Sequence, residues 1–153
     1  PPMLQQKKNK GFTIIEVLIV LAIAGLIMLI VFLAVPALQR NSRNTQRKND
    51  VATYLSAVNE YITNNNGKMP TTAANVTTIN DLANTGFYTE PTTAPQTGAR
   101  TSALTVDTFE LVTGAKCDTS NIGNTVAASG RSYAIRFAVE NSSGGAVPQC
   151  QEG

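Results

Sequence analysis

Hydrophobic and polar positions divide this chain into an apolar N-terminal segment, a polar continuation and a mixed C-terminal half. Residues 17–35 are 19 consecutive apolar residues without a charge. As a helix, such a run spans roughly 28 Å at about 1.5 Å per residue, which is close to the thickness of the hydrocarbon layer of a bilayer. The run is therefore a candidate transmembrane helix.

The helical pattern continues beyond this apolar run. Residues 39–50 are wholly polar, and an apolar stripe with intervals of three and four residues follows them. The stripe consists of Val51, Tyr54, Leu55, Val58, Tyr61 and Ile62. Three asparagines at 64–66, followed by Gly67 and Pro70, predict a left-handed cap and the end of the helix. We expect one helix over about residues 12–65, whose amphipathic second half is covered by a C-terminal sheet.

The C-terminal half combines loops with short strands. Residues 67–103 are rich in Thr, Ala, Asn and Pro and are interpreted as a variable connecting region, with a short helix over 78–85 that Gly86 ends. Strands are predicted over residues 104–112, 132–140 and 146–151. The last is expected to be an antiparallel edge strand despite Pro148. The sequence thus predicts an α+β fold, in which a long N-terminal helix, half transmembrane and half amphipathic, packs on a small antiparallel sheet of three or four strands.

Charge is distributed unevenly along the chain. Three lysines precede the apolar run, namely Lys7, Lys8 and Lys10. They predict that this end stays in the cytoplasm and that the rest of the chain is exported. Without them nine basic side chains face ten acidic ones, a net charge of −1, so no nucleic-acid site is predicted. Arg40, Arg43 and Arg47 recur at helical spacing and are interpreted as a solvated helix face, although they oppose the positive-inside trend.

Composition argues against catalysis. The chain contains no His and no Trp, which removes the commonest metal ligand and general base and excludes Ser-His and Cys-His nucleophiles. We predict no enzyme, no catalytic residue, no metal site and no cofactor. Five carboxylates are candidate calcium ligands, Asp107, Glu110, Asp118, Glu140 and Glu152. They form no D-x-D-x-D-G loop and are interpreted as solvated surface.

One carboxylate lies where a charge is costly. Glu16 is the only charged residue between Phe12 and Gln39, and a carboxylate deep in a membrane costs about 2.5 to 3.5 kcal/mol on insertion scales. Taken alone, Glu16 could be an interfacial residue at the helix end. Its context is GFTIIEVLIVLAIAG, which starts at Gly11 and follows a basic leader. This stretch resembles the processing and assembly signature of type IV pilins and related pseudopilins.

The resemblance implies processing and assembly steps. Residues 1–11 would be a leader that a prepilin peptidase removes by cleaving between Gly11 and Phe12, and the same enzyme would methylate the new amine of Phe12. Glu16 would then neutralise the Phe12 ammonium group of a neighbouring subunit. Residues 12–38 would form the transmembrane and filament-core helix, and residues 39–66 would pack on the globular part.

Two residues weaken the expected helix. Gly25 is a poor helix former, and Pro36 removes a backbone hydrogen bond. Pilins commonly carry a proline about eight residues after the helix glycine, whereas Pro36 follows Gly25 by 11 residues. We predict a melted or bent stretch between these two residues in the filament.

Cys117 and Cys150 are the only cysteines. An even count in an exported domain favours a disulfide over a metal site, because two thiolates without His leave a tetrahedral metal under-ligated. The bridge would close about 34 residues and stabilise by roughly 3 to 4 kcal/mol in the chain-entropy model. Residues 104–153 would then be an antiparallel sheet with a disulfide-bounded C-terminal segment.

Three functions remain open at this point. The first is a pilin of a type IV pilus used for adhesion, twitching motility or DNA uptake, located in the inner membrane as the prepilin and then in an extracellular surface filament. Its partners would be identical subunits, prepilin peptidase, the pilus assembly machinery and membrane lipid. The second is a pseudopilin of a type II secretion system, and the third is a single-span anchored binding module. The cysteine pair favours the pilin, and the anchor leaves Glu16 unexplained.

Overall fold

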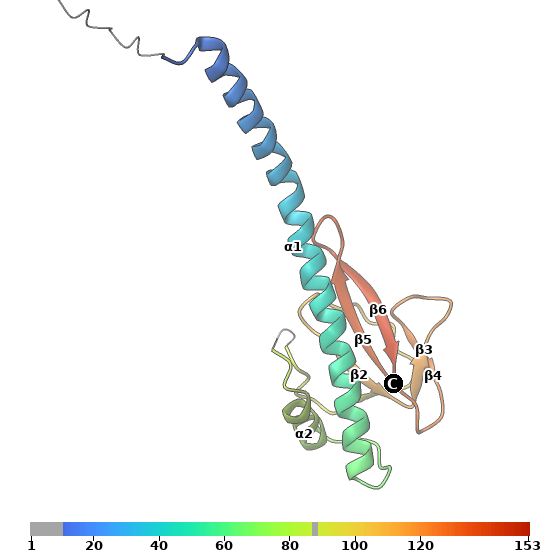
Figure 1. Ribbon diagram of the computed structural model, residues 1–153. Helices are drawn as coiled ribbons and strands as arrows, with labels where there is room; N and C mark the ends of the chain where they lie inside the picture. The colour runs from blue at the N-terminus through green and yellow to red at the C-terminus, as the bar shows by residue number, and fades with distance from the viewer. Residues whose placement is uncertain (1–10, 87–88) are drawn as a thin grey trace, which may run out of the picture. The chain divides into compact units, whose positions relative to one another are not determined.

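The computed structural model describes residues 11–86 and 89–153, so the predicted leader lies outside the described residues except for Gly11. The described residues form two units, one that ends at Gln39 and one that begins at Arg40. The elements are α1 (Ile14–Asn64), α2 (Ala73–Ala83), β1 (Gln96–Thr97), β2 (Glu110–Thr113), β3 (Ala115–Cys117), β4 (Thr125–Ala127), β5 (Tyr133–Glu140) and β6 (Ala146–Glu152) (Figure 1). The long N-terminal helix and the α+β class predicted from the sequence are confirmed.

The first unit contains the apolar half of α1. Its large apolar side chains are exposed, from 39% at Val35 to 90% at Phe12. Among the described residues, α1 is the one helix that is long and apolar enough to cross a membrane. Gly25 and Pro36 both lie inside the helical range of α1 in this isolated subunit.

The end of α1 follows the predicted cap. Asn66 and Gly67 have positive φ values of 58° and 80°, and the Gly67 N–H donates to the Ile62 carbonyl at 2.8 Å. This left-handed geometry satisfies a carbonyl that the last helical turn leaves free, and glycine adopts it without steric cost.

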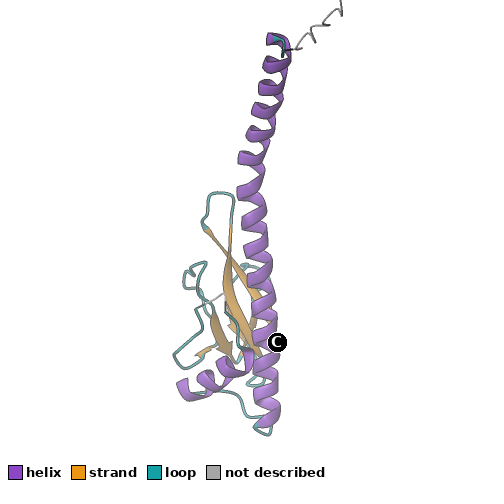
Figure 2. Ribbon diagram, turned by 60° about the vertical axis from the view of Figure 1, so that its left-hand side comes forward, coloured by secondary structure: helices purple, strands orange, loops and turns teal. Residues whose placement is uncertain are grey.

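The second unit is built on a four-stranded sheet of order β1-β2-β5-β6. β5 pairs antiparallel with both β2 and β6, whereas β1 pairs parallel with β2. β3 and β4 form a separate antiparallel pair between β2 and β5 in sequence (Figures 1 and 2). β6 is an edge strand, as predicted, which explains why Pro148 is tolerated in it.

The core of this unit lies between the sheet and the second half of α1. The apolar stripe of α1 faces alternate residues of the sheet, including Ile135 and Phe137 of β5. Tyr54 of α1 meets Phe109 edge to face, with ring centroids 4.7 Å apart. Each fully buried side chain of this kind contributes about 1.5 to 3 kcal/mol. The prediction that the C-terminal sheet covers the stripe is confirmed.

Some predicted boundaries are wrong. β2 begins at Glu110, because residues 104–109 form a loop in which the Asp107 carbonyl accepts from the Thr89 N–H at 2.9 Å. α2 begins at Ala73, five residues before the predicted start, because Thr72 caps it with Asn75 in a reciprocal capping box.

The predicted end of α2 and the set of strands also need correction. α2 ends at Ala83, two residues before the predicted end, because Asn84 caps it in the left-handed conformation before Gly86 is reached. β1, β3 and β4 were not predicted, because segments of two or three residues carry no alternation to detect.

Candidate functional site

A capping box opens α1. The Thr13 hydroxyl accepts a hydrogen bond from the Glu16 N–H, and the Glu16 Oε2 accepts one from the Thr13 N–H, each at 3.2 Å. The Val17 N–H also donates to the Thr13 carbonyl at 3.2 Å. These contacts satisfy donors that a helix start leaves without partners, and the carboxylate is favoured beside the positive end of the helix dipole.

The predicted processing residues lie just outside this cap. Gly11 and Phe12 are non-helical and exposed, and nothing lies within 4 Å of a Cβ placed on Gly11. The peptide bond between them is therefore not held in the hydrogen-bonded helix. Cleavage there and methylation of Phe12 remain predictions.

Glu16 has a role within its own subunit, which the predicted role between subunits does not include. The signal was present, because Thr13 and Glu16 have the S/T-x-x-E spacing of a capping box just before an apolar run. In the isolated subunit the carboxylate is thus oriented by its own helix. The hydrogen bond from Thr13 engages its Oε2.

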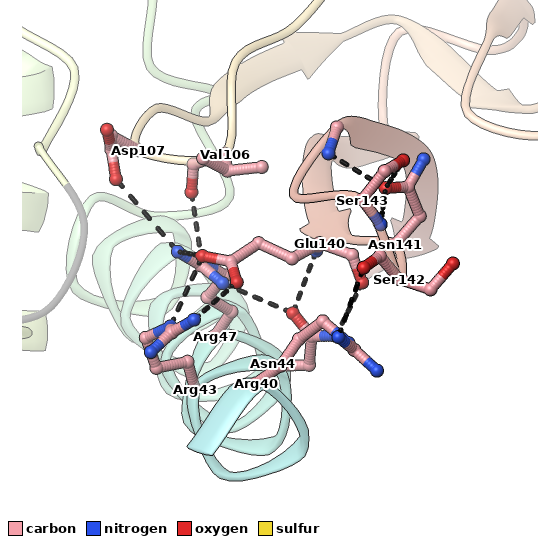
Figure 3. Close-up of polar contacts among 11 residues, drawn as sticks. Arg40, Arg43, Asn44, Arg47, Val106, Asp107, Glu140, Asn141, Ser142 and Ser143 are labelled. Atoms are coloured by element: carbon pink, nitrogen blue, oxygen red, sulfur yellow. Dashed lines mark hydrogen bonds and ion pairs between the residues drawn. The ribbon is translucent and has the colours of Figure 1, made fainter. Parts of the chain in front are cut away.

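The arginines after the apolar run are not a solvated face. Arg47 is 2% exposed, and its guanidinium donates to the Val106 carbonyl at 2.9 Å and to Glu140 Oε1 at 3.0 Å (Figure 3). Arg43 donates two hydrogen bonds to the same carboxylate, at 3.2 and 2.7 Å. The interpretation is wrong for Arg47, which is buried, and incomplete for Arg43, whose side chain is 44% exposed.

Two further contacts join this part of α1 to the end of β5. The Asn44 side chain donates to the Glu140 carbonyl at 2.9 Å and accepts from the Glu140 N–H at 2.8 Å. Arg40 reaches the Ser142 carbonyl at 3.4 Å. The hydrogen bonds from Arg43 are the largest cause of a lowered pKa for the Glu140 carboxyl, because they stabilise its ionised form.

The interpretation of the five carboxylates as solvated surface also needs correction. Glu110 lies half-buried between two arginines, 3.0 Å from Arg136, which is fully buried, and 2.9 Å from Arg100. Glu140 is engaged as described above. In residues 11–86 and 89–153 no three His, Cys, Asp or Glu side chains are grouped so that they could hold a metal ion.

The two cysteines form a disulfide. Cys117 at the end of β3 is bonded to Cys150 in β6, across a sequence separation of 33 residues. The Cys117 N–H also donates to Glu152 at 2.8 Å, and a Cβ at Gly123, whose φ is 87°, would overlap Pro148. The hairpin of β3 and β4 is therefore tied to the edge strand by a covalent bond and by close packing.

Comparison with known proteins identifies the N-terminal segment. Residues 6–32 match the family model described as the prokaryotic N-terminal methylation motif, which is the signature of type IV pilins and prepilins. The matched range includes the Gly11–Phe12 junction, the capping box and Gly25. The predicted resemblance is confirmed over these residues. Searches among curated proteins and among solved structures gave no match for the chain.

Proposed function

We propose that this chain is the subunit of a type IV pilus, held in the inner membrane as a prepilin and polymerised through the first half of α1. The observation that carries the proposal is the exposed apolar half of α1, which follows a capped Thr13–Glu16 start inside the N-methylation motif. Prepilin peptidase would cut between Gly11 and Phe12 and methylate the new amine.

The exposed surface requires an apolar partner. Large apolar side chains follow one another from Ile14 to Val35, and none is buried in the subunit. Apolar patches of this size are unfavourable in water, and a helix of this length fits a bilayer. Before assembly lipid covers the surface, and after assembly the same surface of neighbouring subunits covers it.

Glu16 is the residue that selects the register of this packing. An isolated charge in a low-dielectric core is penalised far more than a matched pair. The capping box engages Oε2 of Glu16, so Oε1 can accept the Phe12 ammonium group of a neighbour while the carboxylate stays oriented. Each added subunit would then neutralise one buried charge of the filament.

The surface filament is favoured over a secretion pseudopilus by the disulfide of Cys117 and Cys150, which strengthens the C-terminal part of the domain that the filament would expose. Adhesion, twitching motility and DNA uptake are the functions such a filament would serve. Identical subunits and the assembly machinery of the inner membrane would be its partners.

The test is to count surface filaments on cells that carry Glu16→Gln. The proposal expects filaments to be lost while the protein stays in the membrane fraction, because the variant can insert but cannot neutralise its neighbour. Glu60→Gln, the same substitution on the exposed side of α1, is the matched control and should leave filament number unchanged. A normal number of filaments with Glu16→Gln would refute the role of Glu16.

A further inference from the structure

We propose that Arg43, Asn44, Arg47 and Glu140, here called the Glu140 clamp, set the point in α1 at which loosening of the helix stops. The inference rests on the proposed function as far as the filament is concerned. The clamp itself is a property of the folded second unit and can be measured without assembly.

Apolar packing does not support the part of α1 that precedes the core. No side chain between residues 11 and 46 is buried, and the first buried residue is Arg47. The apolar stripe that packs on the sheet begins only at Val51. The compact second unit nevertheless begins at residue 40, more than two turns before that stripe. Polar contacts must therefore hold residues 40–47 to the domain.

The clamp supplies these contacts on one side of α1 (Figure 3). Arg43 and Arg47 both donate to the Glu140 carboxylate, and the amide of Asn44 pairs with both backbone groups of Glu140. Glu140 is the last residue of β5, where β6 pairs with one edge of the strand and the Asn44 amide bonds to the other. The helix is thus attached directly to the sheet.

Between the weak points of α1 and the apolar stripe that begins at Val51, the clamp is the main attachment of the helix to the domain among the described residues. Gly25 and Pro36 weaken the exposed part, and because helix formation is cooperative, a melted segment extends until something opposes it. Melting past Asn44 would remove the hydrogen bonds of Arg43 and Asn44 from Glu140, and melting past Arg47 would also separate the ion pair of Arg47 and Glu140, which is strongly unfavourable for buried charges. The clamp therefore confines loosening to residues before about 40.

The experiment is hydrogen exchange, measured by mass spectrometry on the full-length chain in detergent micelles. In the unmodified protein we expect slow exchange from about residue 44 onward. Arg43→Gln and Glu140→Gln should each speed the exchange of amides 44–50 by about two- to fivefold, with amides of α1 near Val58 and of β5 unchanged. Glu60→Gln is the matched control and should change neither region.

The outcomes separate this inference from the proposed function. Unchanged exchange of amides 44–50 in both variants would overturn the clamp, and so would fast exchange there in the unmodified protein. If Glu140→Gln unfolds the domain, Arg43→Gln decides, because its side chain is partly exposed. If Arg43→Gln speeds exchange throughout β5 as much as at amides 44–50, the clamp does not act as a boundary in α1. The micelle measurement needs no filament, so a failure of polymerisation would not affect it.

Discussion

Asn44 and Glu140 are 96 residues apart in sequence, and the side-chain amide of Asn44 pairs with both the N–H and the carbonyl of Glu140, at 2.8 and 2.9 Å. The amide acts as an additional strand residue beside the end of β5. This pairing fixes how the second half of α1 lies along the sheet, and the apolar stripe that begins at Val51 is thereby directed onto the core.

The capping box predicts a local effect of Thr13→Ala. Loss of the hydroxyl removes an acceptor from the helix start, which costs about 0.5 to 2 kcal/mol. Hydrogen exchange in micelles should become faster at the amides of Glu16 and Val17, while the rest of α1 keeps its rates. Thr45→Ala is the control, because its hydroxyl donates back to the Asn41 carbonyl within the helix and caps no helix end. Unchanged exchange at Glu16 would show that the box is not formed in solution.

Protonation of Glu140 in acid should destabilise the fold. Its folded-state pKa is lowered, chiefly by hydrogen bonds from Arg43, so ionised Glu140 stabilises the fold above its unfolded pKa of about 4.3. This stabilisation is lost as the pH falls from the unfolded-state pKa through the lower folded-state pKa, because Glu140 is then protonated. Denaturant unfolding of the full-length chain in micelles, followed from pH 7 to pH 2, should show a smaller acid loss in Glu140→Gln than in the unmodified protein.

Asp118 should also contribute to the loss of stability in acid, so it needs its own control variant. Its pKa is also lowered, with the hydrogen bond from the Ser120 N–H as the largest cause. Asp118→Asn should therefore remove a separate part of the pH dependence. Equal acid profiles for Glu140→Gln and the unmodified protein would contradict the importance of the ion pairs of Glu140.

The disulfide predicts a stability loss on reduction. Cys117 and Cys150 are separated by 33 residues in sequence. For a loop of this length the chain-entropy model gives a loss of unfolding free energy of about 3 to 4 kcal/mol when the bond is reduced. Denaturant unfolding with and without reductant measures this loss. The variant in which both cysteines are replaced by serine should already show it and should not respond to reductant. No shift of the unfolding midpoint on reduction would show that the bridge adds no stability.

The sequence was sufficient for elements with a long or regular pattern. α1 was predicted to within two residues, and β5 was predicted from the strict alternation that starts at Tyr133. The start of β2 was missed because residues 104–109 contain alternating apolar positions that serve a loop packed on α1. Short strands such as β1 were missed because two residues that pair with β2 have no pattern of their own.

The local part of the candidate site could be predicted from the sequence, whereas the part that depends on distant partners could not. Gly11, Phe12 and Glu16 belong to a local motif, so spacing alone identified them. Arg47 was misinterpreted because its partner Glu140 lies 93 residues away. One local signal existed, since Arg47 is four residues before Val51 and therefore continues the buried stripe by one turn. A charged residue on such a stripe requires a buried partner, and only the fold shows which residue that is.

Mass spectrometry of protein from purified surface filaments decides whether the chain is a processed filament subunit. We expect a chain that begins at Phe12, carries one methyl group on its N-terminal amine and retains the bond between Cys117 and Cys150. Recovery of the protein only as a dispersed, unassembled chain with residues 1–11 still attached would contradict it.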